Sequence, residues 1–152
     1  AGWEYLHVAV DDHSRVAYVA LLPDEGEEAV RRFLRGALRW FCAHGVRTRR
    51  ILTDNGSAYR SRSFRAACRA LRVRHRRTRP YTPRTNGKAE RFIQTALREW
   101  AYRRPYYTSA DRGRVLPGWL EHYNCARPHT SLNRQPPMSR FPQGNNLMLV
   151  HT

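Results

Sequence analysis

Long apolar runs are missing from this 152-residue sequence, and none approaches the roughly 20 residues that a membrane-spanning helix needs. No secretory signal peptide is recognisable, and the sequence begins at Ala1 without methionine, which predicts a fragment or a trimmed product. The three cysteines, Cys42, Cys68 and Cys125, form no Cys-x-x-Cys pair. Such an odd, scattered set is typical of free thiols in a reducing compartment. We expect Cys42 and Cys68 in the core, because both fall on apolar helix faces.

Acidic residues are scarce, and lysine is nearly absent. The sequence has 12 acidic residues against 28 basic ones, a net charge of +16, and Lys88 is the only lysine. This excess indicates a polyanionic partner, with nucleic acid the leading candidate. Arginine suits phosphate because its planar fork bonds two oxygens at once. A solvated basic face explains any single arginine equally well, and ribosomal-type proteins are as basic, so charge alone does not define a function.

The order of elements predicted from apolar periodicity is typical of one α/β domain. Apolar runs predict strands at 5–10, 16–22 and 49–53, the first two forming a hairpin, and a basic edge strand at 74–79. Helical spacing of apolar residues predicts helices around 30–41, 64–71 and 89–100, and another at 109–123 that is interrupted or started at Pro117. From Gln135 we expect an extended tail. The predicted division is a core at 1–104 and a helical and extended continuation at 105–152.

Capping residues predict where the helices begin and end. Asp24 followed by Glu27 has the pattern of a capping box for the first helix, and Ser63 is a candidate cap for the second. Gly45 is expected to end the first helix, because glycine readily adopts the left-handed conformation that follows a helix.

Two motifs stand out against this background. Thr53-Asp54-Asn55-Gly56 is predicted at the end of a strand, and Asn86-Gly87-Lys88-Ala89-Glu90-Arg91 leads from a proline-containing loop into a helix. Residues 55–89 separate Asp54 from Glu90, a gap of 35. A strand-end aspartate and a first-turn glutamate are suitable ligands for a divalent metal. Each motif alone is common, since Asp-Asn-Gly is an ordinary turn and first-turn glutamates favour any helix.

Taken in order, the motifs resemble the catalytic core of retroviral-type integrases and bacterial insertion-sequence transposases, the D-D-E recombinases. Asp-x-x-Ser-Arg at 11–15 fits the resemblance, and the run Tyr123-Asn124-Cys125-Ala126-Arg127-Pro128-His129-Thr130-Ser131-Leu132 looks like the segment that follows the core in the bacterial branch. The resemblance covers roughly residues 3–141. It implies a ribonuclease H-like mixed sheet flanked by helices, and metal-dependent cleavage and transfer of DNA strands.

The resemblance also assigns roles to residues. Asp54 and Glu90 would be catalytic as ligands of Mg²⁺ or Mn²⁺, because two metals can hold the attacking and leaving oxygens of a phosphodiester. Lys88 is placed to meet a phosphate near the metals, and DNA contacts are expected from Tyr81, Arg84, Asn86, Lys88 and Arg91. The implied partners are DNA, as element ends and target, and further copies of the chain. The expected location is the bacterial cytoplasm in association with the nucleoid.

One part of the family pattern is missing. The family's first carboxylate lies in a first strand at the middle of the sheet, between the hairpin and the strand that carries Asp54. Here only Glu4 precedes Asp11, and it is in the wrong place. The strand is absent, or Asp11 or Asp12 substitutes, or the copy is decayed. Absence of the strand would open the core and leave the fragment inactive. For Asp11 we favour a turn-capping role with Ser14, with the catalytic role as the weaker alternative.

The sequence is also compatible with two other functions, and one pair of residues has metal-ligand spacing. A non-catalytic basic nucleic-acid-binding domain, from a decayed or truncated transposase, is the alternative to the enzyme, and a ribonuclease is a weaker third option. Metal dependence separates the first two, because a binding protein should bind DNA equally well in EDTA. His122 and Cys125 have the spacing of half a zinc site, but no second pair accompanies them, so we expect no zinc there.

Overall fold

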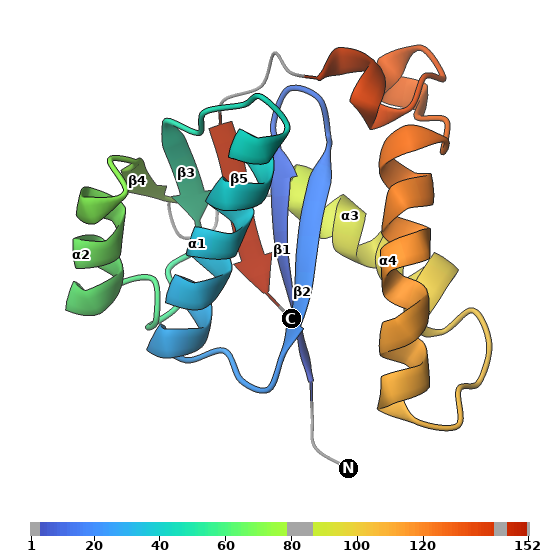
Figure 1. Ribbon diagram of the computed structural model, residues 1–152, viewed down its shortest axis with the longest axis horizontal. Helices are drawn as coiled ribbons and strands as arrows, with labels where there is room; N and C mark the ends of the chain where they lie inside the picture. Colours follow the sequence, from blue (N-terminus) through green and yellow to red (C-terminus); the bar gives the residue numbers. More distant parts are fainter. Residues whose placement is uncertain (1–3, 79–86, 142–145, 152) are drawn as a thin grey trace.

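The computed structural model describes residues 4–78, 87–141 and 146–151. A five-stranded mixed sheet with the strand order β2-β1-β5-β3-β4 forms its centre (Figure 1). The β1–β2 and β1–β5 pairs are antiparallel, whereas β5–β3 and β3–β4 are parallel. The strands are β1 Tyr5–Asp11, β2 Ala17–Leu22, β3 Arg50–Thr53, β4 Arg74–Arg77 and β5 Asn146–His151.

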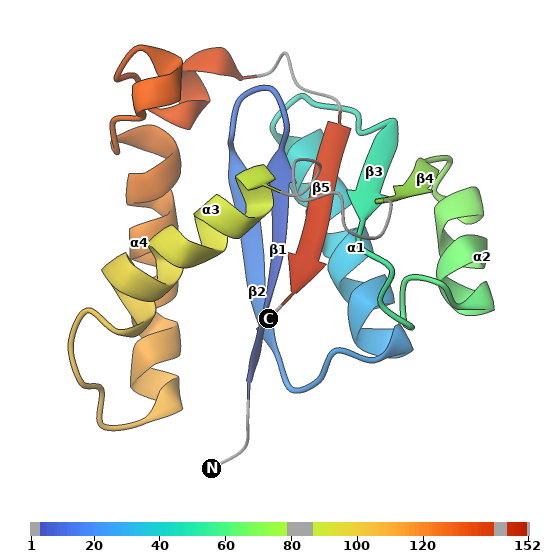
Figure 2. The ribbon, with the colours of Figure 1, turned by 180° about the vertical axis from the view of Figure 1, so that it is seen from behind.

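Helices cover both faces of this sheet, as Figures 1 and 2 show from opposite sides. Helix α1 packs on one face and α3 on the other, while α4 runs along β2. The predicted α/β class is therefore confirmed. The helices are α1 Glu27–Ala43, α2 Arg62–Ala70, α3 Gly87–Ala96 and α4 Ser109–Cys125, with a π-helical turn at Leu97–Ala101 and 3₁₀ turns at Thr130–Leu132 and Pro137–Arg140.

Strand β5 occupies the middle of the sheet, where the sequence led us to expect a gap. It is hydrogen-bonded to β1 on one side and to β3 on the other. Leu147 and Leu149 are buried in the core under α1, whereas Met148 and Val150 are buried in the core under α3. The expectation of an open core was therefore wrong. A strand buried on both faces reads as a continuous apolar run, and 147–150 is such a run.

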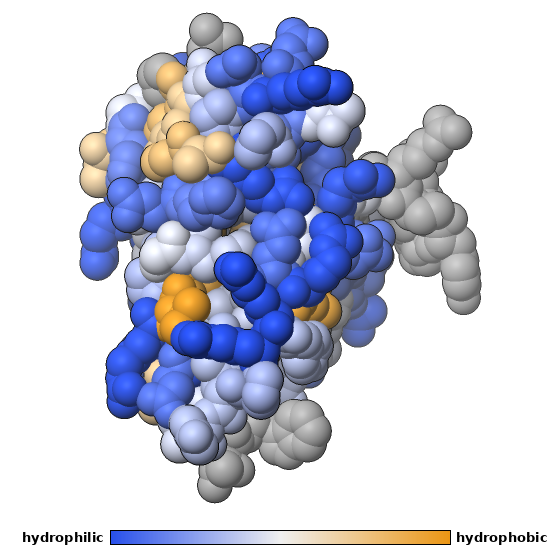
Figure 3. All heavy atoms as spheres, turned by 90° about the vertical axis from the view of Figure 1, so that its right-hand side faces the viewer, coloured by the Kyte–Doolittle hydropathy of each residue, from blue (hydrophilic) through white to orange (hydrophobic). Residues whose placement is uncertain are grey.

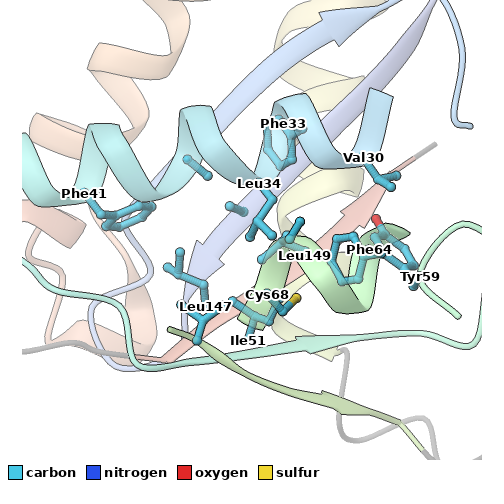
Figure 4. Close-up of a cluster of buried hydrophobic side chains, with 14 of the residues drawn as sticks. Val30, Phe33, Leu34, Phe41, Ile51, Tyr59, Phe64, Cys68, Leu147 and Leu149 are labelled. Atoms are coloured by element: carbon cyan, nitrogen blue, oxygen red, sulfur yellow. The ribbon is translucent and has the colours of Figure 1, made fainter. Parts of the chain in front are cut away.

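Each face of the sheet has its own hydrophobic core. On the α1 face, Leu34, Phe41 and Phe64 are fully buried (Figure 4). On the α3 face, the ring of Phe92 meets the edge of Tyr123, with 4.8 Å between centroids. Aromatic pairs in this geometry contribute beyond their buried area. The second core therefore ties α3 to α4.

The helix starts differ in detail from those predicted. Ser61, not Ser63, caps α2, because its Oγ accepts a hydrogen bond from Phe64 N at 3.1 Å. The expected capping box of α1 does not form. Gly26 is the N-cap, and Asp24 Oδ1 accepts instead from Gly26 N at 2.9 Å. The aspartate thus closes a short turn ahead of the helix.

The end of α1 follows the prediction. Gly45 has a φ of +87° and donates to Cys42 O at 3.0 Å, while Val46 N donates to Phe41 O at 2.9 Å. This is a Schellman motif, which satisfies carbonyls that the helix leaves free. Cys42 is exposed, contrary to expectation, because Phe41 fills the core position of this last turn. Cys68 is buried, as expected, and α4 continues without interruption through Pro117.

Candidate functional site

Asp54 lies immediately after β3 and is half-buried. Its Oδ1 accepts a hydrogen bond from Gly56 N at 2.7 Å, an Asx turn that fixes the carboxylate at the end of the strand. Asn55 Nδ2 donates to Thr78 O at 2.5 Å, which ties this turn to the end of β4. Only Oδ1 of Asp54 takes part in a hydrogen bond among the described residues, so Oδ2 remains available to a cation.

Two titratable side chains near the end of β3, Tyr59 and His75, are held in the neutral state. Burial, and then the charge of Asp54, raise the pKa of Tyr59 well above its usual value. Burial and the nearby Arg77 lower the pKa of His75, whose Nε2 is 2.7 Å from Thr53 Oγ1. Neither group therefore adds charge beside Asp54 at neutral pH.

Glu90 lies in the first turn of α3 with an exposed side chain, on an element that packs against β1 and β5. Ala89 and Phe92 bury the sheet-facing side of the helix. Lys88 fixes the start of α3, because its Nζ contacts Asp12 Oδ1 at 2.6 Å and Asp12 O at 3.0 Å. The lysine predicted to meet a phosphate is therefore paired with the β1–β2 turn.

Asp54 and Glu90 belong to two elements that both contact β5. Asp54 follows β3, which pairs with β5 in the sheet, and Glu90 lies on α3, which packs on the face of β5. Strand β5 thus occupies the position in the sheet that the resemblance assigns to the strand with the first carboxylate. Strand β5 carries no acidic residue. Within the described parts of the chain, no three His, Cys, Asp or Glu side chains gather into a metal site.

Asp11, the low-ranked third candidate, has the turn role that we favoured. Its Oδ2 accepts hydrogen bonds from Ser14 N at 3.1 Å and Ser14 Oγ at 2.5 Å, and the residue is 1% exposed. The register places Asp11 level with Ile51, three residues before Asp54 and two strands away. At ordinary strand spacings this is about 14 Å between Cα atoms, too far for the two carboxylates to share one metal.

The other predicted site residues divide into two groups. Tyr81, Arg84 and Asn86 lie outside the described residues. Arg91 is exposed on α3, one turn after Lys88. His122 is exposed at the end of α4, as is Cys125, and neither belongs to a cluster of metal ligands in the described chain.

The 123–132 motif has structural roles that sequence reasoning missed. Asn124 is buried and bridges α4 to the sheet edge, because its side-chain amide accepts from Ala17 N and donates to Ala17 O, both at 2.9 Å. Arg127 forms a two-point ion pair with Glu99, with Nε–Oε1 at 3.0 Å and Nη2–Oε2 at 2.8 Å. The asparagine thus takes the place of a further strand beside β2.

Sequence comparison matches the chain to integrase core domains and shows similarity to insertion-element proteins. Residues 1–83 match a family described as integrase core domain, and residues 71–137 match a second family of the same description. The transposase InsD of insertion element IS2 from Escherichia coli is 35% identical over 86 residues, which cover 57% of this chain and 29% of that protein. An uncharacterized protein of insertion element IS136 from Agrobacterium fabrum is 34% identical over 86 residues, 57% of this chain and 44% of that protein. The match spans less than half of either relative.

Two solved structures share this architecture. A chain in the cryo-EM structure of a simian T-cell lymphotropic virus intasome, in complex with PP2A regulatory subunit B56 gamma, gives a TM-score of 0.76 at 26% identity over 94% of this chain and 51% of that one. The catalytic core domain of BIV integrase gives a TM-score of 0.69 at 17% identity over 91% of this chain and 87% of that one. The mixed sheet with flanking helices is thus ribonuclease H-like, as predicted.

Proposed function

The chain belongs to the integrase core domain family, and from this premise we propose that it is the catalytic core of a transposase or integrase that cleaves and joins DNA strands. The family match over residues 1–83, which includes Asp54, carries the proposal. The similarity to the IS2 transposase supports it, and so does the net charge of +16, which suits a DNA partner. Element ends and target DNA are the proposed substrates.

Integrase-type catalytic cores generally use divalent metal ions. In this chain we propose that Asp54 and Glu90 would hold Mg²⁺ or Mn²⁺, which prefer carboxylate oxygens. When bound, the metal compensates the negative charge that develops on the phosphate oxygens. The Oδ2 of Asp54, which accepts no hydrogen bond within the described ranges, and the exposed carboxylate of Glu90 suit this role.

A third carboxylate is the missing part of this proposed site. All 12 acidic residues of the sequence lie in the described ranges, because residues 1–3, 79–86, 142–145 and 152 contain no Asp or Glu. Those ranges contain no cluster of three metal ligands. We therefore propose that these 152 residues supply two ligands, bind DNA and do not cleave it unaided.

Other features are proposed from the family and the charge. Tyr81, Arg84, Asn86 and Arg91 are the proposed DNA contacts of the loop and of the first turns of α3. Lys88 would join them only by leaving Asp12.

Assembly into a homo-oligomer is proposed because the similar retroviral chain comes from an intasome. No helix in the described ranges is long and apolar enough to cross a membrane. Association with the bacterial nucleoid is proposed from DNA binding alone.

The test compares two forms of the protein on labelled duplex DNA, with Mg²⁺, with Mn²⁺ and with EDTA. The first form is the 152-residue chain, which should bind DNA equally in all three and leave it intact. The second carries an added N-terminal strand with one aspartate, and it should cleave only with metal. In this second form Asp54→Asn and Glu90→Gln should abolish cleavage and retain binding. The asparagine can still accept from Gly56 N, so the turn survives while the charge is lost.

Glu121→Gln is the matched control, because Glu121 is an exposed carboxylate on α4. It should cleave like its parent. Metal-dependent cleavage by the 152-residue chain would overturn the proposal that these residues supply only two ligands and would bring Asp11 or Asp12 back as the third ligand. Full cleavage in the extended Glu90→Gln protein would refute the metal-site assignment. Binding in EDTA without cleavage in either form would favour a non-catalytic binding domain.

A further inference from the structure

A groove of about 850 Å³ runs between α3 and the segment that follows α4. Lys88 and Arg91 line it from α3, Arg98 lines it from the π-helical turn that follows α3, and Arg127 lines it from the segment after α4. Arg15, from the β1–β2 turn, also lines the groove. None of the lining residues is acidic. Five cations from three separate parts of the chain therefore face one hollow.

Arg127 is held in a fixed orientation at this groove. Glu99 accepts from its Nε and Nη2, and the guanidinium carbon lies 5.9 Å from the centre of the Tyr123 ring. The hydrogen bond from Arg127 lowers the pKa of Glu99, so the pair is fully ionised at neutral pH. The ion pair uses one edge of the guanidinium and leaves Nη1 outside it. Glu99 itself lies in the π-helical turn at the end of α3.

Arg15 is also fixed in place. Its φ is +71°, and its Nη1 donates to Asp12 O, the same carbonyl oxygen that Lys88 contacts. Burial lowers the pKa of His129, and the charges of Arg127 and Arg15 lower it further. Both arginines line the same groove as this imidazole, which stays neutral at neutral pH.

The α3 wall has the length of a short stretch of nucleic-acid backbone. Lys88, Arg91 and Thr95 of α3 line the groove together with Arg98 of the π-helical turn that continues the helix, and ten residues at α-helical spacing rise about 15 Å. Measured along the axis of duplex DNA, each strand carries one phosphate about every 3.4 Å, so a wall parallel to that axis spans roughly four phosphates of one strand. Thr130 and Ser131 add hydroxyls on the far wall, which suit phosphate and sugar oxygens.

We propose that this groove binds the phosphate backbone of one DNA strand alongside the helix that carries Glu90, with Arg127 as a phosphate contact and Glu99 as the residue that positions it. The identity of the polyanion as DNA rests on the proposed function, whereas the groove and its charges do not. Figure 3, which faces the α4 side of the molecule, shows a surface coloured mainly hydrophilic. Such a surface suits a charged, hydrated ligand better than an apolar one.

The test is fluorescence anisotropy with a labelled 20-nucleotide DNA, single-stranded and duplex, over a range of salt concentrations. The groove pair Arg91→Ala/Arg98→Ala is compared with Arg35→Ala/Arg39→Ala, two exposed arginines on α1 across the sheet. Both pairs remove the same charge. The groove pair should lower affinity about tenfold or more and reduce the salt slope by about two, and the α1 pair should do neither. Equal losses from both pairs would overturn the proposal.

Glu99→Gln adds a second, independent readout. The change removes a negative charge, so general electrostatics alone would strengthen DNA binding. If Glu99 positions Arg127, binding should weaken instead, because the amide offers one oxygen acceptor where the carboxylate offered two. Stronger binding would refute the positioning role.

These experiments measure DNA binding only. The effect of Asp54→Asn on cleavage therefore tests the proposed function and not the proposal that the groove binds DNA. An anionic membrane is the alternative ligand for the groove, and vesicles that contain phosphatidylserine test it. Binding to vesicles that competes with DNA and matches its affinity would reassign the groove to a membrane.

Discussion

Truncation of Leu149 tests most directly whether β5 occupies the central position of the sheet. Its side chain is completely buried in the α1-side core, and in register it lies between Ala9 of β1 and Thr53 of β3. Leu149→Ala removes buried methyl groups and leaves a cavity between two hydrogen-bonded neighbours that cannot close on it. Fully buried leucines of this kind cost about 3–4 kcal/mol when truncated. For a domain of this size the melting temperature should fall by about 6–15 °C.

The assay is urea and thermal unfolding followed by circular dichroism, with Leu71→Ala as the matched control. Leu71 is 36% exposed at the end of α2, so its truncation should cost less than about 1 kcal/mol. Met148→Ala should also be costly, because Met148 is 4% exposed in the core on the opposite face. Equal stability of the Leu149 and Leu71 variants would show that β5 is not in the sheet, and the account of a closed core would fail.

Three smaller perturbations follow from the same contacts. Asn124→Ala should cost about 1–3 kcal/mol in urea titration, because Ala17 N and O lose their partners at a buried site. The hydrogen bond from Arg127 lowers the pKa of Glu99, so the stability gained from the pair is present above the usual value of 4.5 and is lost as pH falls through the folded value. The stability difference between wild type and Glu99→Gln should therefore shrink on acidification, and a constant difference would contradict this. Gly45→Ala should cost about 1–2 kcal/mol through its positive φ alone, since nothing lies within 4 Å of the added Cβ; calorimetry measures this.

The sequence predicted most elements because each has a local signal. Apolar runs marked β1, β2 and β3, and helical spacing marked all four helices. Gly45 ended α1 as expected, because a left-handed residue after a helix is a property of a few neighbouring residues. Asp54 and Glu90 were found at a strand end and in a helix first turn for the same reason.

The misses are the features that depend on distant partners. The Leu-Met-Leu-Val run of β5 is visible in the sequence, but its place between β1 and β3 depends on pairing with strands about a hundred residues away or more. Asn124 is 107 residues from Ala17, and Arg127 is 28 from Glu99. An asparagine at the end of a predicted helix was the available clue to an edge contact. Periodicity in the sequence does not indicate that Ala17 is the partner of Asn124.

The position of β5 constrains how the proposed catalytic site can be completed. The resemblance places a carboxylate-bearing strand between the hairpin and β3, and β5 already makes backbone hydrogen bonds to both neighbours in that position. Two strands cannot occupy one position, so an added strand with an aspartate must displace β5 before it can bring a third ligand near Asp54. In the extended protein that tests cleavage, we therefore expect the amides of 147–150 to exchange rapidly with solvent, whereas in the 152-residue chain they should exchange only on global unfolding. Protection of these amides in an extended, cleaving protein would mean that the third ligand reaches Asp54 without using the central position of the sheet.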